Sequence, residues 1–176
     1  VVAAIFVHSG TGFIFGIING RDMYFSSITP LAFVVAALSS GTALAMIMLY
    51  FTFKFANRTI DTRFFLQLSK LMLGLIIFVF YLVTIEHLTH LYDPEFRHGE
   101  MFVMFGGNFL TFVFWGQLYL IGILIPVFIL FNPGTRNRVG WILAAGAMHI
   151  VGVLGERMLF ILPGQILAQP IMPGYE

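Results

Sequence analysis

The sequence predicts an all-α fold, a polytopic transmembrane helix bundle, and three observations lead to it. Hydrophobic residues make up 59% of the 176 residues and charged residues only 10%, whereas average soluble domains carry about 25% charged residues. Five apolar runs follow one another, and the last four each reach the roughly 20 residues that cross a bilayer. The runs are continuous rather than alternating over about ten residues, which excludes a membrane β-barrel.

Polar stretches separate the expected helices within a single bundle over residues 1–176. The first helix begins at once in "VVAAIFV" and is followed by "NGRDMYFSSITP", so we expect the chain to be a fragment that starts inside a helix. The second helix ends at "KFANRTIDTR", the third at "DPEFRHGE" and the fourth at "NPGTRNR", and the tail "PGQILAQPIMPGYE" follows the fifth. The expected helices are 1–18, 31–53, 64–92, 101–131 and 139–162.

Lysine and arginine gather in alternate connections between these helices. Lys54, Arg58 and Arg63 follow the second helix, and Arg136 and Arg138 follow the fourth. The other two connections hold one arginine each, and the tail holds none. The positive-inside rule therefore predicts that the second and fourth connections are cytoplasmic, and that the other two and the tail lie outside.

Titratable residues lie inside the apolar runs, near their expected outer ends. Glu86, His87 and His90 fall within the oily stretch "VFYLVTIEHLTHLY", and the spacing of Glu86 and His90 puts them on one helix face. A carboxylate at that depth needs a partner, a proton or water. We therefore expect these three residues to transfer protons.

Two more expected helices contribute polar side chains to the same outer half. His8 lies on the first helix, below the stretch with Arg21 and Asp22, and Glu156 and Arg157 lie near the outer end of the fifth. Arg157 could instead extend to the membrane surface or pair with Glu156. His149, two turns before Glu156, could simply bond a neighbouring helix.

Other polar features have simpler expected roles. The small residues of "ALSSGTALA" predict close helix packing. For Asn108 and Gln117 we favour interhelical hydrogen bonds over the lining of a pocket. Asp93, Glu95 and Glu100 are expected to form a solvated face.

Three kinds of chemistry suit a buried group of carboxylates and imidazoles. A quinone head group needs hydrogen-bond donors and a route for protons, which Arg, His and Glu can supply. A haem b would need histidines that face each other across helices. A proton or ion transporter would use the same groups as a relay without redox chemistry. The chain has no Cys for an iron–sulfur cluster of its own, and no basic run suggests nucleic acid.

Two stretches resemble the NrfD/PsrC family of membrane subunits, most closely its DsrP-like branch. They are "HSGTGFIFGIINGRDMYFSSITPLAFVVAALSSGTAL" (His8–Leu44) and "LGERMLFILPGQ" (Leu154–Gln165). The resemblance implies a haem-free bundle of eight to ten helices, so at least three would be missing here. It implies electron exchange between membrane quinone and an iron–sulfur, ferredoxin-like subunit on the outer face.

Residue by residue, the resemblance covers only part of the candidate site. His8 matches the family's motif histidine with Arg21 beside it, and Glu156 and Arg157 match its "ER" pair. The candidates Asp22, Glu86, His87 and His90 rest on position alone.

We therefore expect a quinone-reactive subunit that is not an enzyme by itself, within a respiratory oxidoreductase complex of a prokaryotic cytoplasmic (inner) membrane. His8, Arg21, Asp22, Glu156 and Arg157 would hold the head group of menaquinone or ubiquinone. Further cytochrome or catalytic subunits and membrane lipid are the other expected partners. The alternatives are a haem-b membrane anchor and a proton or ion transporter.

Overall fold

The computed structural model describes residues 2–17, 26–58 and 62–166, and these residues form helices without any strand. The all-α fold predicted from the sequence is confirmed. The helices are α1 (Val2–Ile17), α2 (Thr29–Phe55), α3 (Thr62–Tyr92), α4 (Pro94–Phe105), α5 (Phe109–Phe112), a π-helical segment (Val113–Leu124), α6 (Ile125–Phe131), α7 (Pro133–Arg136), α8 (Val139–Ile161) and α9 (Pro163–Ile166).

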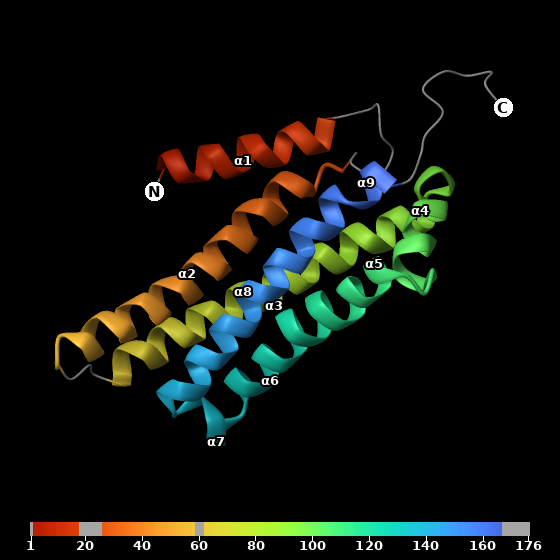
Figure 1. Cartoon of the computed structure of the whole chain (residues 1–176). Coiled ribbons are helices and arrows are strands. Elements are labelled where there is room, and N and C mark those ends of the chain that lie inside the picture. Colours follow the sequence, from red (N-terminus) through yellow and green to blue (C-terminus); the bar gives the residue numbers. More distant parts are fainter. Residues whose placement is uncertain (1, 18–25, 59–61, 167–176) are drawn as a thin grey trace, which may run out of the picture.

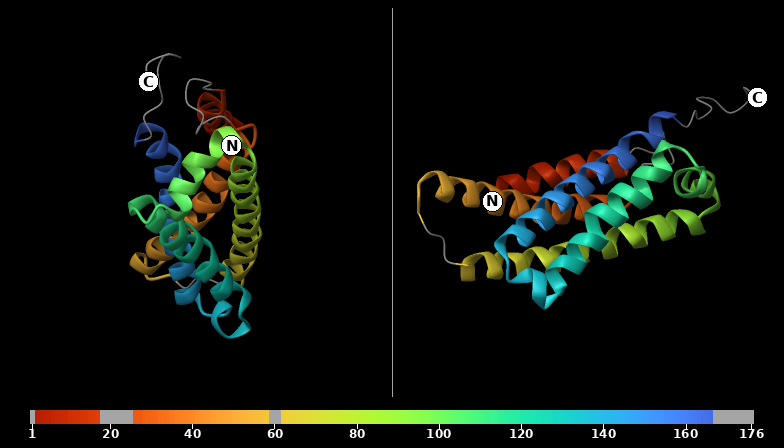
Figure 2. Two further views of the ribbon diagram at one scale, coloured as in Figure 1. Left: turned by 90° about the vertical axis from the view of Figure 1, so that its right-hand side faces the viewer. Right: turned by 60° about the horizontal axis from the view of Figure 1, so that its bottom comes forward.

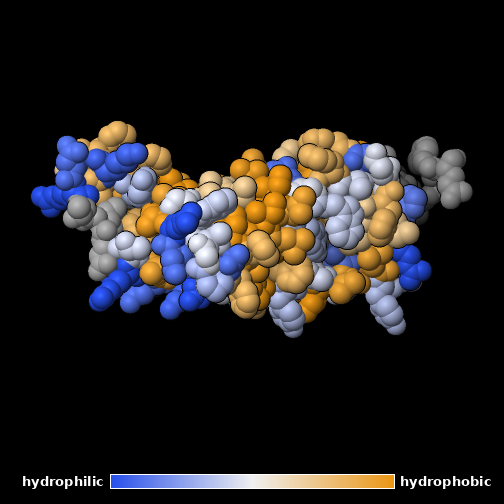
Figure 3. Space-filling model, turned by 90° about the horizontal axis from the view of Figure 1, so that it is seen from below, coloured by the Kyte–Doolittle hydropathy of each residue, from blue (hydrophilic) through white to orange (hydrophobic). Residues whose placement is uncertain are grey.

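Within the described residues, four helical stretches are long and apolar enough to cross a membrane. The first two are α2 and α3, and a third consists of α8 continued by α9. The remaining stretch, Phe109–Phe131, consists of α5, the π-helical segment and α6 end to end. They run side by side, and α1 lies along α2 at the edge of this bundle (Figures 1 and 2). A hydrophobic belt lies next to a hydrophilic end on the face shown in Figure 3. The protein is therefore a multi-pass membrane protein.

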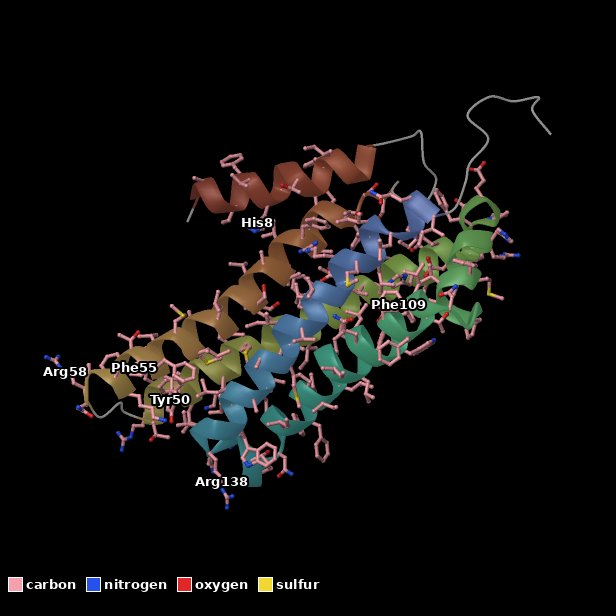
Figure 4. The ribbon with its side chains drawn as sticks, viewed as in Figure 1. His8, Tyr50, Phe55, Arg58, Phe109 and Arg138 are labelled. Atoms are coloured by element: carbon pink, nitrogen blue, oxygen red, sulfur yellow. The ribbon has the colours of Figure 1, made fainter. Side chains whose placement is uncertain are left out.

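The basic connections lie at one end of the bundle. Figure 4 shows Arg58, after α2, and Arg138, before α8, at the same end, and α4 lies at the opposite end in Figure 1. This arrangement follows the alternation of charge in the sequence. The assignment of the basic end to the cytoplasm stays a prediction from the positive-inside rule.

The prediction of one continuous helix over 101–131 is wrong, and so is the prediction of a loop over 93–100. Residues from Pro94 to Phe105 form α4, and a turn then separates α4 from the membrane-spanning stretch. Gly107 adopts φ +64°, a left-handed conformation that glycine reaches without strain. Asn108 then begins α5, because its side-chain oxygen accepts a hydrogen bond from the Thr111 amide at 3.0 Å.

The start of α4 follows from the sequence Asp-Pro-Glu. Pro94 disfavours helical geometry at Asp93, which is extended with ψ 123°, so α3 ends at Tyr92. The Asp93 carboxylate accepts a hydrogen bond from the Glu95 amide at 3.1 Å and caps the new helix. Arg97 reaches back to the last carbonyls of α3, at Leu91 and Tyr92, and holds α4 over the end of α3.

Small residues bring the long helices into close contact. A Cβ at Gly122 would stand 2.5 Å from Gly152 Cα, so the π-helical segment and α8 cross at two glycines. A Cβ at Gly146 would stand 3.4 Å from that of Ala43, which confirms close packing at "ALSSGTALA". Gln117 Nε2 donates to Val151 O at 2.9 Å, the interhelical bond expected from the sequence. Asn108 instead bonds across the nearby turn, to Phe102 O at 3.0 Å.

Candidate functional site

Five titratable side chains from three helices line one small cavity at the end of the bundle that carries α4. Their helices are α3, α4 and α8, and the cavity volume is about 30 Å³, enough for a water molecule. The five are Glu86, His87, His90, Glu100 and Glu156. We call this group the carboxylate–imidazole cluster. It brings together the three expected proton-transfer residues and one of the expected quinone ligands.

Glu100 of α4 bridges the two histidines of the cluster. His87 Nδ1 lies 2.6 Å from Glu100 Oε1, and His90 Nδ1 lies 3.7 Å from Oε2. Burial by itself raises the pKa of Glu100, but its hydrogen bonds and Coulombic interactions with His87 and His90 outweigh this and lower the pKa to about 2. Glu100 is therefore a fixed negative charge that orients both imidazoles.

Glu100 is only 1% exposed, so the expectation that it belongs to a solvated face is wrong. It lies on the inward stripe of α4, with Phe96, Gly99, Val103 and Met104 at helical spacing. The missed signal was Asp-Pro-Glu, which marks a helix start. Once α4 is read as a helix, its apolar stripe places Glu100 inside.

Glu86 and Glu156 differ in how their carboxylates are satisfied. Thr29 Oγ1, at the start of α2, donates to Glu86 Oε1 at 2.8 Å. Glu156 is 1% exposed, and neither of its oxygens has a hydrogen-bond partner among the described residues. An unsatisfied buried carboxylate is costly, so Glu156 needs a proton, a water or a ligand's donor. Thr29 was not anticipated, because nothing in the sequence pairs it with α3.

Arg157, the next residue of α8, faces a second and larger cavity. Its guanidinium carbon lies 3.5 Å from the centre of the Phe33 ring, and Nη2 donates to Phe33 O at 3.5 Å. Nη1 is buried and lies 4.0 Å from Glu156 Oε1, beyond hydrogen-bond distance, with no other partner among the described residues. Nη1 of Arg157 is thus a buried donor without a hydrogen-bond acceptor among the described residues.

This second cavity, which we call the arginine cavity, lies between α1, α2 and α8 and has a volume of about 400 Å³. His8 of α1 and Ser40 of α2 line it together with Arg157. Both residues also line an adjoining apolar hollow of about 520 Å³ with Leu38, Leu44 and other residues of α1, α2 and α8. Figure 4 shows His8 on the side of α1 that faces α2. A mostly apolar cavity with a few polar side chains therefore adjoins an apolar hollow.

The expected quinone ligands do not all lie together. His8 and Arg157 line the arginine cavity, whereas Glu156 lines the cavity of the carboxylate–imidazole cluster. Arg21 and Asp22 lie outside the described residues. The roles of all these residues stay predictions.

His149 makes two interhelical hydrogen bonds. Its Nδ1 lies 2.7 Å from Gly122 O, and its Nε2 lies 2.8 Å from Ser39 Oγ. The ring joins the π-helical segment, α8 and α2 beside the Gly122–Gly152 contact. Both ring nitrogens are engaged, so His149 fits the simpler structural role and has no nitrogen available for a haem iron.

The family model for the polysulphide reductase NrfD matches residues 1–169 of this chain. The chain is 38% identical to the "Hdr-like menaquinol oxidoreductase integral membrane subunit" of Archaeoglobus fulgidus, over 98% of this chain and 44% of the relative. It is 32% identical to a selenate reductase subunit of Mesobacillus selenatarsenatis, over 94% of this chain and 38% of the relative. It is 22% identical to "Protein NrfD" of Escherichia coli, over 94% of this chain and 51% of the relative.

The chain thus spans about half or less of the length of these curated relatives. The family predicted from the resemblance is confirmed over nearly the whole chain, and the DsrP-like branch stays a prediction. The chain belongs to the NrfD family of polytopic membrane proteins.

Proposed function

We propose that this chain is the quinone-reactive part of a membrane subunit in a multi-subunit respiratory oxidoreductase. One observation carries the proposal: Arg157 lines the arginine cavity and the adjacent Glu156 lines the cavity of the carboxylate–imidazole cluster, and both hold buried polar atoms without a hydrogen-bond partner among the described residues. The names of the relatives from Archaeoglobus fulgidus and Mesobacillus selenatarsenatis, which refer to a menaquinol oxidoreductase and a selenate reductase, support it.

The arginine cavity and its apolar hollow suit the two parts of a quinone. Arg157 donates a hydrogen bond to a carbonyl oxygen of the head group, and its charge stabilises a developing quinolate. His8, across the cavity on α1, contacts the other side of the head group. The isoprenoid tail lies along the apolar hollow beside Leu38 and Leu44.

The carboxylate–imidazole cluster handles the protons of the reaction. Oxidation of a quinol releases two electrons and two protons, and reduction of a quinone takes up the same number. Glu156 exchanges protons with the head-group side and passes them, through the small cavity, to Glu86 and the imidazole of His87. Glu100 holds that imidazole in place.

Electrons pass to or from an iron–sulfur subunit docked on the outer face, because the chain has no cysteine for a cluster of its own. Menaquinone is the proposed quinone, since the Archaeoglobus fulgidus relative is named for menaquinol. The proposed location is the cytoplasmic membrane of a prokaryote, in complex with further catalytic subunits.

The test is steady-state quinol oxidation by the purified full-length complex with an artificial electron acceptor. Arg157→Lys keeps the charge but loses the planar guanidinium that stacks on Phe33. We expect the KM for the quinol to rise about tenfold, the cost of one good charged hydrogen bond. The control Arg138→Lys, at an exposed position of the opposite end, should leave KM unchanged. An unchanged KM in Arg157→Lys would remove the arginine cavity as the quinone site.

A further inference from the structure

A third cavity lies at the basic end of the bundle, away from the carboxylate–imidazole cluster. Its volume is about 470 Å³, and it lies between α3 and the segment of α6 and α7. Most of its wall is apolar, with Leu66 and Leu73 from α3 and Phe128 and Phe131 from α6. The quinone chemistry proposed above makes no use of it.

Two cations stand at this apolar wall, Lys70 on α3 and Arg136 on α7. Both side chains are exposed, and no carboxylate in the described parts of the chain forms an ion pair with either. Lys54 nearby, by contrast, lies over the Tyr50 ring at 5.8 Å. The charge of Lys70 and Arg136 is thus available to an anion at the cavity.

The position of the cavity along the bundle indicates what kind of anion. Its lining comes from α3, α6 and α7. The connection that holds α7 lies at the same end of the bundle as Arg58 and Arg138 (Figures 1 and 4). The positive-inside rule assigns this end to the cytoplasmic side, whose leaflet attracts basic residues through its anionic lipids. A ligand there must offer a negative head to two cations and an acyl chain to leucine and phenylalanine.

We propose that this cavity binds an anionic phospholipid. Lys70 and Arg136 hold the phosphate from opposite walls, and Leu66, Leu73 and Phe128 contact an acyl chain. A free phosphate would leave the apolar wall uncovered, and a zwitterionic lipid would place a third positive charge beside the two cations. The site is independent of quinone turnover, so it stands or falls separately from the function proposed above.

The test measures lipid binding to the purified full-length complex by native mass spectrometry, during titration with phosphatidylglycerol. The variant Lys70→Gln/Arg136→Gln should bind the lipid about 30-fold more weakly, at about fivefold for each lost hydrogen bond between a cation and the phosphate. The control Arg58→Gln/Arg138→Gln removes the same charge from exposed positions of the same end. Its affinity should stay within about twofold of the wild type.

Further arms separate the alternatives. Lys70→Arg/Arg136→Lys keeps both charges and should retain the lipid, which shows that loss in the glutamine variant is not a folding defect. If the ligand is an anionic lipid, phosphatidylcholine should bind at least tenfold more weakly than phosphatidylglycerol. In addition, 10 mM inorganic phosphate should not displace bound phosphatidylglycerol. Equal binding by the glutamine variant and its control, no preference for phosphatidylglycerol, or displacement by phosphate would each overturn the proposal.

Discussion

Glu156 and Arg157 are consecutive residues of α8, yet they line different cavities. Neighbours on an α-helix point about 100° apart, because the helix has 3.6 residues per turn. Glu156 therefore lies in the carboxylate–imidazole cluster with Glu86, while Arg157 stacks on Phe33 beside the arginine cavity. A two-residue motif thus joins the proposed head-group contact to a group that can take a proton.

Replacing Glu156 by Gln should slow turnover without weakening quinol binding. The amide keeps the shape of the carboxylic acid but cannot exchange a proton, and loss of a general acid or base costs about 100-fold or more. We expect kcat for quinol oxidation to fall by about that factor, with KM within about twofold. Glu95→Gln is the control, because Glu95 is an exposed carboxylate of α4. Wild-type kcat in Glu156→Gln would take Glu156 out of the proton route.

Glu100 should make stability depend on acid pH. Its pKa is lowered to about 2 from 4.5, so the folded state binds this proton more weakly than the unfolded state. Its stabilising effect is complete above the unfolded pKa, near 4.5, and is lost as the pH falls toward 2. Glu100→Gln should therefore reduce the free energy of unfolding of the full-length subunit at neutral pH by about 2 kcal/mol. The loss is measured as a lower thermal midpoint.

The difference between wild type and Glu100→Gln should shrink when both are melted at pH 4 and then at pH 3. Asp93→Asn serves as a comparison that removes a charge outside the cluster, at the start of α4. A difference in thermal midpoint that stays constant from pH 7 to pH 3 would show that the interactions of the Glu100 carboxylate with His87 and His90 are not its source.

The glycine crossing between the π-helical segment and α8 should not tolerate a side chain. A Cβ at Gly152 would collide with the backbone of Gly122, whose carbonyl also bonds His149. Gly152→Ala should destabilise the subunit by about 1–3 kcal/mol, as overpacking does, measured as the thermal midpoint in detergent. Gly140→Ala, on the same helix with nothing near its Cβ position, should be neutral or slightly stabilising. Equal thermal midpoints for Gly152→Ala and Gly140→Ala would mean that the π-helical segment and α8 can move apart at this crossing without loss of stability.

The full-length subunit, separated from its partners, should show no b-type haem band in a reduced-minus-oxidised visible spectrum. A haem iron needs histidine nitrogens that are available to it. Both nitrogens of His149 are hydrogen bonded, and His87 and His90 lie on the same helix, α3, so they cannot face each other across helices. A haem band would favour the haem-b anchor expected as an alternative and would make some of these histidines ligands.

The sequence by itself determined the fold class and the ends of the bundle. Length and continuity of the apolar runs require membrane helices, because only closed hydrogen bonding of the backbone is tolerated in lipid. The placement of lysine and arginine put the connections after α2 and α6 at one end, where the structure has Arg58 and Arg138. Glu86, His87 and His90 were found because titratable groups are rare at that depth.

Only the tertiary structure decided which of these groups meet. Glu100 entered the cluster because the chain turns at Asp93–Pro94 and Arg97 holds α4 over the end of α3, whereas hydropathy alone runs from α4 straight through the later turn at Gly107. His149 hydrogen bonds to two neighbouring helices. Lys70 and Arg136, which are 66 residues apart in the sequence, line the same cavity. The physical reason is that lipid fixes the direction of each helix, whereas the rotation and pairing of helices depend on close contacts such as Gly122–Gly152.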